Sequence, residues 1–91
     1  MNDNETYLNH PNFGLLYRVC SIEQNRELYT TLYAQRLFFL VTLGSEGNLT
    51  FESLGRSDAR LVMENRLRQL RRKRFSVEYE QLNATYQRIF R

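Results

Sequence analysis

The chain has 91 residues, of which 42% are hydrophobic and 25% charged, and its formal net charge is +3. This length predicts one small domain with a thin core, and the apolar content is too high for a wholly disordered chain. A single cysteine, Cys20, excludes an internal disulfide, and no apolar run approaches the roughly 20 residues of a membrane span.

Residues 13–51 show the patterns of short β-strands. FGLLYRVC alternates with period two, and LYTTLYA and LFFLVTL are rich in the β-branched and aromatic residues that suit a pleated sheet. SIEQNRE, between the first two runs, is a polar break that suits a hairpin loop, and GSEGN is a turn followed by a closing strand, LTFES. Residues 1–55 are therefore predicted to form a small antiparallel barrel or a strongly bent sheet.

Residues 56–91 change to a helical period. Ser57 is the expected N-cap of a first helix, and Arg60 and Glu64 are spaced to form an ion pair on it. A second helix is expected after Ser76, and the short connector RRKRFS predicts that the two helices pack antiparallel as a hairpin. The fold class is α+β. The apolar stripes of the two helices are Ala59, Val62, Met63, Leu67 and Leu70, then Tyr79, Leu82, Tyr86, Ile89 and Phe90.

Charge is distributed unevenly between these two parts. Residues 1–55 carry three arginines against six carboxylates, whereas residues 56–91 carry ten basic side chains against four. The basic run RLRQLRRKR can neutralise phosphates, so a small nucleic-acid-binding module is one hypothesis. No helix-turn-helix spacing or RNA-binding aromatic motif accompanies the run, which favours a solvated helix face or a protein-docking surface.

The residue types needed for catalysis are sparse. His10 is the only histidine, and no orienting third group accompanies a pairing with Cys20. One histidine and one cysteine also fall short of the three or four ligands of a zinc site. We therefore expect no enzyme activity, no metal and no bound cofactor. The polar, acidic N-terminus predicts no signal peptide, and a cytoplasmic location is expected.

The stretch LYAQRLFFLV joins two predicted strands through a corner without Gly or Asn. A tight two-residue hairpin is not favoured there. Two interpretations of the bulky residues Tyr33, Leu37 and Phe39 stay open at this point. They are either core residues, in the barrel or beneath the helices, or anchors of a recognition patch in which Gln35 and Arg36 supply directional hydrogen-bond donors.

Four blocks of sequence decide between these interpretations: YLNHPNFGLLYRVC, LYTTLYAQRLFFLV, GRSDARLVMENRLRQLRR and EYEQLNATYQ. With these blocks, which cover nearly the whole chain, the sequence resembles the PipX family of cyanobacterial PII-interacting proteins. The resemblance implies a Tudor-like β-barrel followed by two α-helices. It also implies a transcriptional co-regulator of nitrogen signalling with two alternative partners, the PII signalling protein and the transcription factor NtcA.

The resemblance implies that the two partners compete for one barrel surface. PII would hold the protein when 2-oxoglutarate is scarce and ADP is favoured, and NtcA would take it, and be co-activated, when 2-oxoglutarate is abundant. Small molecules would act through the partners, and the helices would face RNA polymerase or another regulator rather than DNA or a membrane. The family's partner-binding positions match Tyr33, Gln35, Arg36, Leu37, Phe39 and Glu5 in this chain, whereas Gln24 stands where the family can have an acidic residue.

Overall fold

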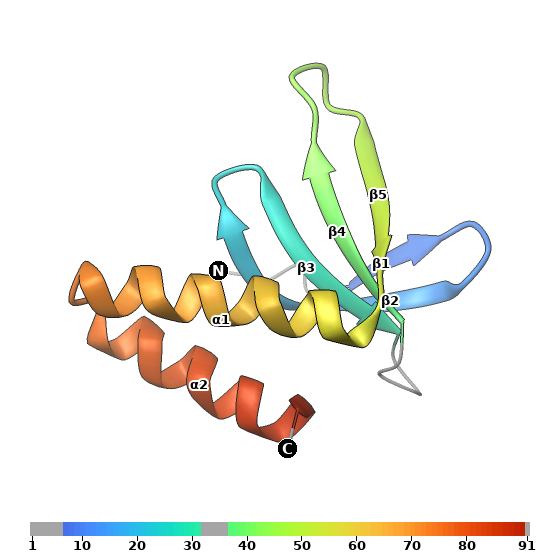
Figure 1. Cartoon of the computed structure of the whole chain (residues 1–91). Helices are drawn as coiled ribbons and strands as arrows, with labels where there is room; N and C mark the ends of the chain where they lie inside the picture. The colour runs from blue at the N-terminus through green and yellow to red at the C-terminus, as the bar shows by residue number, and fades with distance from the viewer. Residues whose placement is uncertain (1–6, 32–36, 91) are drawn as a thin grey trace.

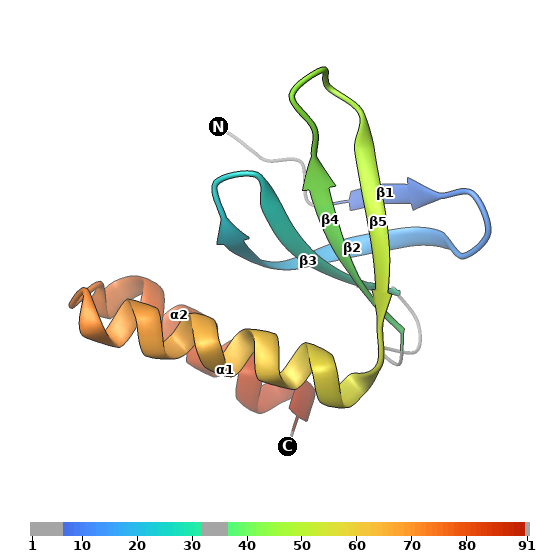
Figure 2. The same cartoon turned by 45° about the horizontal axis from the view of Figure 1, so that its top comes forward.

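Five strands followed by two helices make up the chain, as the computed structural model shows for residues 7–31 and 37–90. The strands are β1 (Tyr7–His10), β2 (Gly14–Glu23), β3 (Arg26–Thr31), β4 (Phe38–Leu43) and β5 (Leu49–Leu54), and the helices are α1 (Arg56–Arg72) and α2 (Ser76–Phe90). The strands pair antiparallel in chain order, and the sheet curls into a half-barrel beside the helical hairpin (Figure 1, Figure 2). The predicted α+β class is confirmed.

Strand β1 was missing from the prediction. It pairs with β2, with Tyr7 opposite Tyr17 and Leu8 opposite Leu16, and the turn between the two strands ends at Gly14, whose φ is +77°. Its side chains alternate between exposed and half-buried, and the two half-buried ones, Leu8 and His10, pack on a core cluster. A short edge strand gives little hydrophobic signal, because only one of its faces meets the core.

The polar break SIEQNRE is also shorter than expected. Strand β2 continues to Glu23 and β3 begins at Arg26, so only two residues separate them. Polar side chains of the two strands pair with each other: Arg18 with Glu27 at 3.0 Å and Arg26 with Glu23 at 3.4 Å. These pairs let the strands extend through a polar segment, because opposite charges on paired strands stabilise the pairing.

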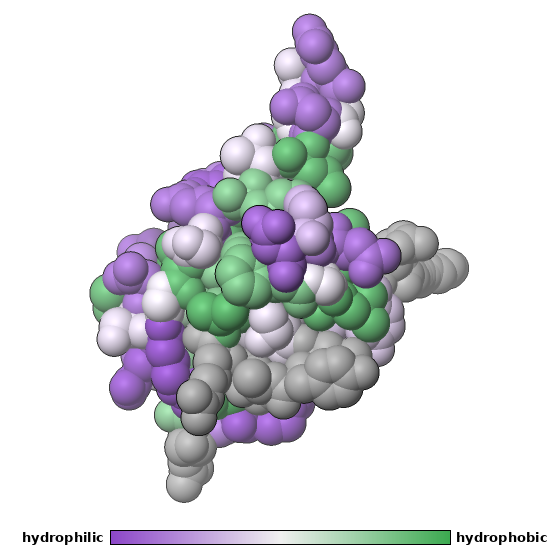
Figure 3. Space-filling view, turned by 90° about the vertical axis from the view of Figure 1, so that its right-hand side faces the viewer, coloured by the Kyte–Doolittle hydropathy of each residue, from purple (hydrophilic) through white to green (hydrophobic). Residues whose placement is uncertain are grey.

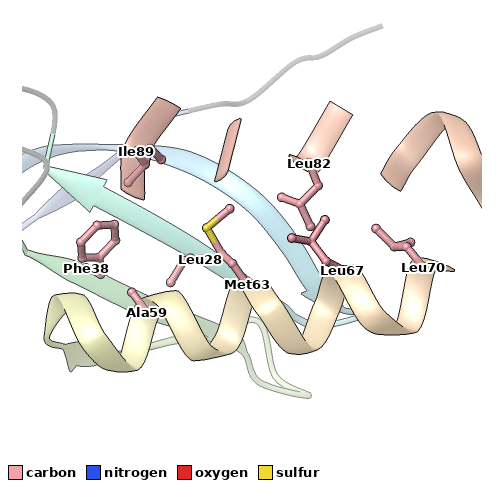
Figure 4. Close-up of a cluster of buried hydrophobic side chains, with 8 residues drawn as sticks. All are labelled: Leu28, Phe38, Ala59, Met63, Leu67, Leu70, Leu82 and Ile89. Carbon is pink, nitrogen blue, oxygen red and sulfur yellow. The ribbon is translucent and has the colours of Figure 1, made fainter. Parts of the chain in front are cut away.

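The two faces of the sheet carry separate hydrophobic clusters. Phe38 and Phe39 are neighbours in β4, so their side chains point to opposite faces, and both are buried. Phe38 packs against the helices, whereas Phe39 packs in a second cluster on the opposite face of the sheet. The helix-side cluster, shown in Figure 4, contains Leu28, Phe38, Ala59, Met63, Leu67, Leu70, Leu82 and Ile89. The second cluster contains Leu16, Tyr29, Phe39 and Val41, with Leu8 and Phe51 packed against it.

The helix stripes are largely confirmed, but the start of α1 is not. The buried residues of α1 and α2 all belong to the predicted stripes. Gly55, not Ser57, is the N-cap, and no side chain caps the helix. Arg60 and Glu64 form the expected ion pair at 3.2 Å. The helix-side cluster contains residues of both the strands and the helices. The division of the chain at residue 55 into two domains stays a prediction.

Helix α1 ends in a Schellman motif that holds an arginine in the left-handed region. The amide of Phe75 donates to the carbonyl of Leu70 at 3.0 Å, and the amide of Arg74 donates to that of Arg71 at 3.1 Å. Arg74 has a φ of 61°, a conformation that glycine adopts without steric cost. The connector therefore carries backbone strain at an exposed basic residue.

Replacing Arg74 by glycine is expected to raise the free energy of unfolding by about 0.5–1 kcal/mol, because it removes the Cβ clash of the left-handed conformation. Urea denaturation of the two proteins measures the difference. The control is Arg72→Gly in the last turn of α1, which is expected to lower stability by about 1 kcal/mol. A loss of stability in both variants would contradict this account of Arg74.

Candidate protein-docking surface

The corner predicted to bind partners connects β3 to β4. Its residues Tyr33, Gln35 and Arg36, and Glu5 near the N-terminus, lie outside the described residues, so their role stays a prediction. The base of the corner is described. The amide of Thr31 donates to the carbonyl of Leu37 at 3.2 Å, and the hydroxyl of Thr30 donates to the same oxygen at 2.8 Å. Two hydrogen bonds thus hold the chain together where the corner begins and ends.

Leu37 and Phe39, the two described members of the predicted set, differ sharply in exposure. Leu37 is 42% exposed and can contact a partner directly. Phe39 is 2% exposed and belongs to the second hydrophobic cluster. In the structure of the free chain, Phe39 is therefore a core residue. Its part in binding stays a prediction, and burial indicates that it would act by supporting its neighbours.

An aromatic cluster next to Phe39 was not predicted from the sequence. The ring of His10 lies 4.9 Å from Phe39, 5.1 Å from Phe13 and 5.1 Å from Phe51, measured between centroids. The His10 Nδ1 atom accepts hydrogen bonds from the amides of Asn12 at 3.0 Å and Phe13 at 3.3 Å, which places the proton of the neutral ring on Nε2. His10 therefore orders the β1–β2 turn and connects it to the face that carries Phe39.

The β1–β2 hairpin also exposes large apolar side chains. Tyr7 is 50% exposed, Phe13 49% and Leu15 39%. The hairpin extends past the start of α1, on the side of the molecule where the β3–β4 corner begins and ends (Figure 1). Figure 3, which looks at the molecule from that side, shows hydrophobic surface gathered below the β4–β5 hairpin and bordered by polar surface. Exposed apolar side chains that gather on one face are typical of protein-interaction sites.

Cys20, a partly buried residue of β2, packs against the helix-side cluster. Burial raises the pKa of its thiol from 9.0 to about 12, while Arg66 and Arg18 act weakly in the opposite direction. The thiolate is the reactive form, so this environment suppresses nucleophilic chemistry. This agrees with the interpretation of Cys20 as a structural strand residue.

The Cys20 thiol is expected to react with iodoacetamide at pH 8 at least tenfold more slowly in the folded protein than in the unfolded chain. The unfolded thiol ionises as pH rises through about 9.0, whereas the folded thiol keeps its proton until about 12. The contribution of Cys20 to stability is therefore complete below pH 9 and is lost as pH rises towards 12. Mass spectrometry of samples quenched over time, with and without guanidinium, measures the two rates, and equal rates would contradict the burial argument.

A polar network joins the two helices. The Tyr86 hydroxyl donates to Glu64, and Arg60 donates to Glu64 at 3.2 Å and to the Tyr86 oxygen at 3.0 Å. The hydrogen bond from Tyr86, assisted by Arg60, lowers the pKa of the Glu64 carboxyl. All three groups are satisfied within the helical hairpin, so the network positions α2 on α1.

Residues 7–31 and 37–90 meet the requirements of neither a metal site nor a membrane-spanning helix. No three His, Cys, Asp or Glu side chains gather there in a way that could hold a metal ion. Neither described helix is long and apolar enough to cross a membrane.

These features define a small α+β protein-interaction module. They are the curled sheet, the exposed apolar side chains of the β1–β2 hairpin and the hydrogen-bonded base of the β3–β4 corner. Residues 4–90 match the family model of PipX, PII-interacting protein X. Because this match spans nearly the whole chain, the protein belongs to the PipX family. The family's name describes a protein that interacts with PII, and the family is a regulatory one rather than a known enzyme family. Comparison with curated proteins gives no match.

Proposed function

We propose that this protein is a non-enzymatic, cytoplasmic co-regulator of transcription that exchanges between PII and NtcA. PII holds it when 2-oxoglutarate is scarce and ADP is favoured, and NtcA takes it, and is co-activated, when 2-oxoglutarate is abundant. The observation that carries the proposal is the family match over residues 4–90. The proposed role needs no cofactor in this chain, because 2-oxoglutarate, ATP and ADP act on the partners.

The proposed shared surface is centred on the β3–β4 corner. Tyr33, Gln35 and Arg36 would contact both partners from the corner, Glu5 from the N-terminal segment, and Leu37 from the base. The exposure of Leu37 and the apolar surface of the β1–β2 hairpin support this placement. Aromatic residues and arginine are the side chains that most often dominate the energy of protein interfaces.

Because PII and NtcA would compete for one surface, a change in the affinity of PII for this protein would decide which partner is bound. A ligand shifts an equilibrium only by its different affinity for the two states. 2-Oxoglutarate would therefore act twice: it would lower the affinity of PII for this protein and raise that of NtcA. Co-activation follows if this protein binds the active conformation of NtcA more tightly than the inactive one. The helices, which lie on the other face of the sheet, would remain open to RNA polymerase or another regulator.

Replacing Tyr33 or Arg36 by alanine is expected to weaken binding to both PII and NtcA by about 1–4 kcal/mol, because both are proposed anchors of the shared surface. Isothermal titration calorimetry with each purified partner measures the loss, and circular dichroism verifies folding. Glu46→Ala, in the exposed β4–β5 turn, is the control and is expected to leave both affinities unchanged. Unchanged binding of the Tyr33 and Arg36 variants to both partners would defeat the shared-surface model.

The exchange itself is tested by a pull-down of this protein with PII. Capture is expected with ADP, and release with ATP plus 2-oxoglutarate. Capture that is the same under both conditions would contradict the metabolite switch while leaving PII binding intact.

A further inference from the structure

A groove runs between the β2–β3 turn and the C-terminal half of α1. It consists of two adjoining pockets that share Ser21 and Arg66. The larger pocket has a volume of about 680 Å³ and is lined by Ser21, Ile22, Glu23, Gln24, Arg66, Gln69, Arg72 and Lys73. The smaller has a volume of about 220 Å³ and is lined by Val19, Cys20, Ser21, Arg66, Leu70, Glu78, Gln81, Leu82 and Thr85.

The larger pocket is cationic. Arg66, Arg72 and Lys73 line its helical wall, and its one carboxylate, Glu23, is already paired with Arg26 at 3.4 Å. Lys73, the C-cap of α1, follows Arg66 by seven residues, about two helical turns, so both side chains lie on the same side of the helix. Within residues 7–31 and 37–90, no ion pair involves Arg66, Arg72 or Lys73. The positive charges of the pocket can therefore pair with an anionic ligand.

Helix-end electrostatics explains only part of this charge. Cations in the last turn of a helix interact favourably with its dipole, and this accounts for Arg71 and Arg72. Arg71 is further engaged by the ring of Tyr79, 5.4 Å from its guanidinium carbon. Arg66 lies well before the last turn, and its side chain donates to Gln69 at 3.2 Å, on the wall of the groove. Its position beside both pockets points to a role in binding.

We propose that this groove binds an acidic peptide segment of a partner protein. Carboxylates of the segment pair with Arg66, Arg72 and Lys73, and one large apolar side chain enters the smaller pocket against Val19, Leu70 and Leu82. The hydroxyl of Ser21, the amide of Gln24 and the amide nitrogen of Gln69 line the pocket and would hydrogen-bond the peptide backbone.

Single-stranded nucleic acid fits this groove less well than an acidic peptide. Nucleic acid could use the same cations through its phosphates, but its bases stack on aromatic side chains. The residues that line the two pockets include no aromatic side chain. The smaller pocket combines the apolar side chains of Val19, Leu70 and Leu82 with polar ones, Glu78 among them, and lies beside the cationic pocket. This arrangement suits a peptide in which one apolar side chain stands among carboxylates.

The groove is separate from the proposed surface for PII and NtcA. The β2–β3 turn and the β3–β4 corner lie at opposite ends of β3, whose six residues span about 20 Å. Helix α1 reaches the groove with its C-terminal half, while it begins near the end of β3 and the start of β4 (Figure 1). An acidic segment can therefore bind here whether or not another protein occupies the corner, and the proposal stands independently of the proposed function.

The test uses the full chain and a fluorescein-labelled peptide of twelve residues, made of glutamate and serine with one central leucine. Fluorescence anisotropy at low salt is expected to show binding that weakens as salt is added. The double substitution Arg66→Gln with Lys73→Gln is expected to weaken binding about tenfold, and leucine-to-alanine replacement in the peptide about fivefold. The matched control, Arg68→Gln with Arg88→Gln, removes the same charge from exposed residues outside both pockets and is expected to change affinity less than twofold.

Two results would overturn the proposal. Equal weakening by the two double substitutions would show that overall charge, not the groove, attracts the peptide. A single-stranded oligo-dT of twelve nucleotides that binds more tightly than the peptide, and loses affinity in the Arg66 and Lys73 variant alone, would assign the groove to nucleic acid. Circular dichroism confirms that each variant is folded.

Discussion

Replacing Phe38 by alanine is expected to lower the free energy of unfolding by about 3–5 kcal/mol. The side chain is fully buried in the helix-side cluster, where it meets residues of both helices. Its ring stacks on Phe90 at 5.7 Å, and Figure 4 shows it between β4 and the start of α1. Removing the ring leaves a cavity at the junction of sheet and helices, so lost burial and an unfilled void add together.

Urea denaturation followed by circular dichroism measures this loss. Phe75 provides a matched control, because Phe75→Ala is the same chemical change in a side chain that is 47% exposed. It is expected to change stability by about 0.5 kcal/mol or less. Similar losses in the two variants would mean that the helices do not depend on packing at Phe38, and the docked arrangement of sheet and hairpin would have to be reconsidered.

Periodic apolar residues made the helices and the central strands predictable. The stripe from Ala59 to Leu70 has the spacing of an amphipathic helix, and all buried residues of α1 belong to it. Strand β1 and the polar ends of β2 and β3 were not predictable in this way. They are held by backbone pairing and by ion pairs such as Arg18–Glu27, which leave no hydrophobic period in the sequence.

Side chains alternate along β4, so Phe38 and Phe39 lie on opposite faces, but the sequence does not indicate which face meets the helices. Both faces of the strand carry bulky apolar residues, so the pattern alone is symmetric. The aromatic cluster around His10 depends on contacts between β1, β4 and β5. The groove between Gln24 and Arg66 likewise joins segments far apart in the sequence. Such features arise only from tertiary structure, so local patterns do not reveal them.

Phe39 is the second position at which a substitution is expected to have a large effect, because its ring is buried like that of Phe38. Phe39→Ala is expected to lower the free energy of unfolding by about 3–5 kcal/mol, because the ring is 2% exposed and packs against His10 and Phe13. Phe39→Leu keeps most of the buried volume and is expected to cost about 1–2 kcal/mol. Thermal and urea denaturation measure both values.

Substitutions at Phe39 and Leu37 distinguish two roles in binding. A buried residue supports the surface from below, whereas an exposed residue contacts the partner directly. Phe39→Leu is expected to bind PII within about threefold of the unchanged protein, since a buried ring that acts through packing can be replaced by another apolar side chain. Leu37→Ala is expected to change stability by about 1 kcal/mol or less but to weaken PII binding about fivefold or more, because Leu37 is 42% exposed at the base of the corner. If a fully folded Phe39→Leu protein failed to bind PII while Leu37→Ala bound normally, the Phe39 ring itself would have to leave the core and contact the partner.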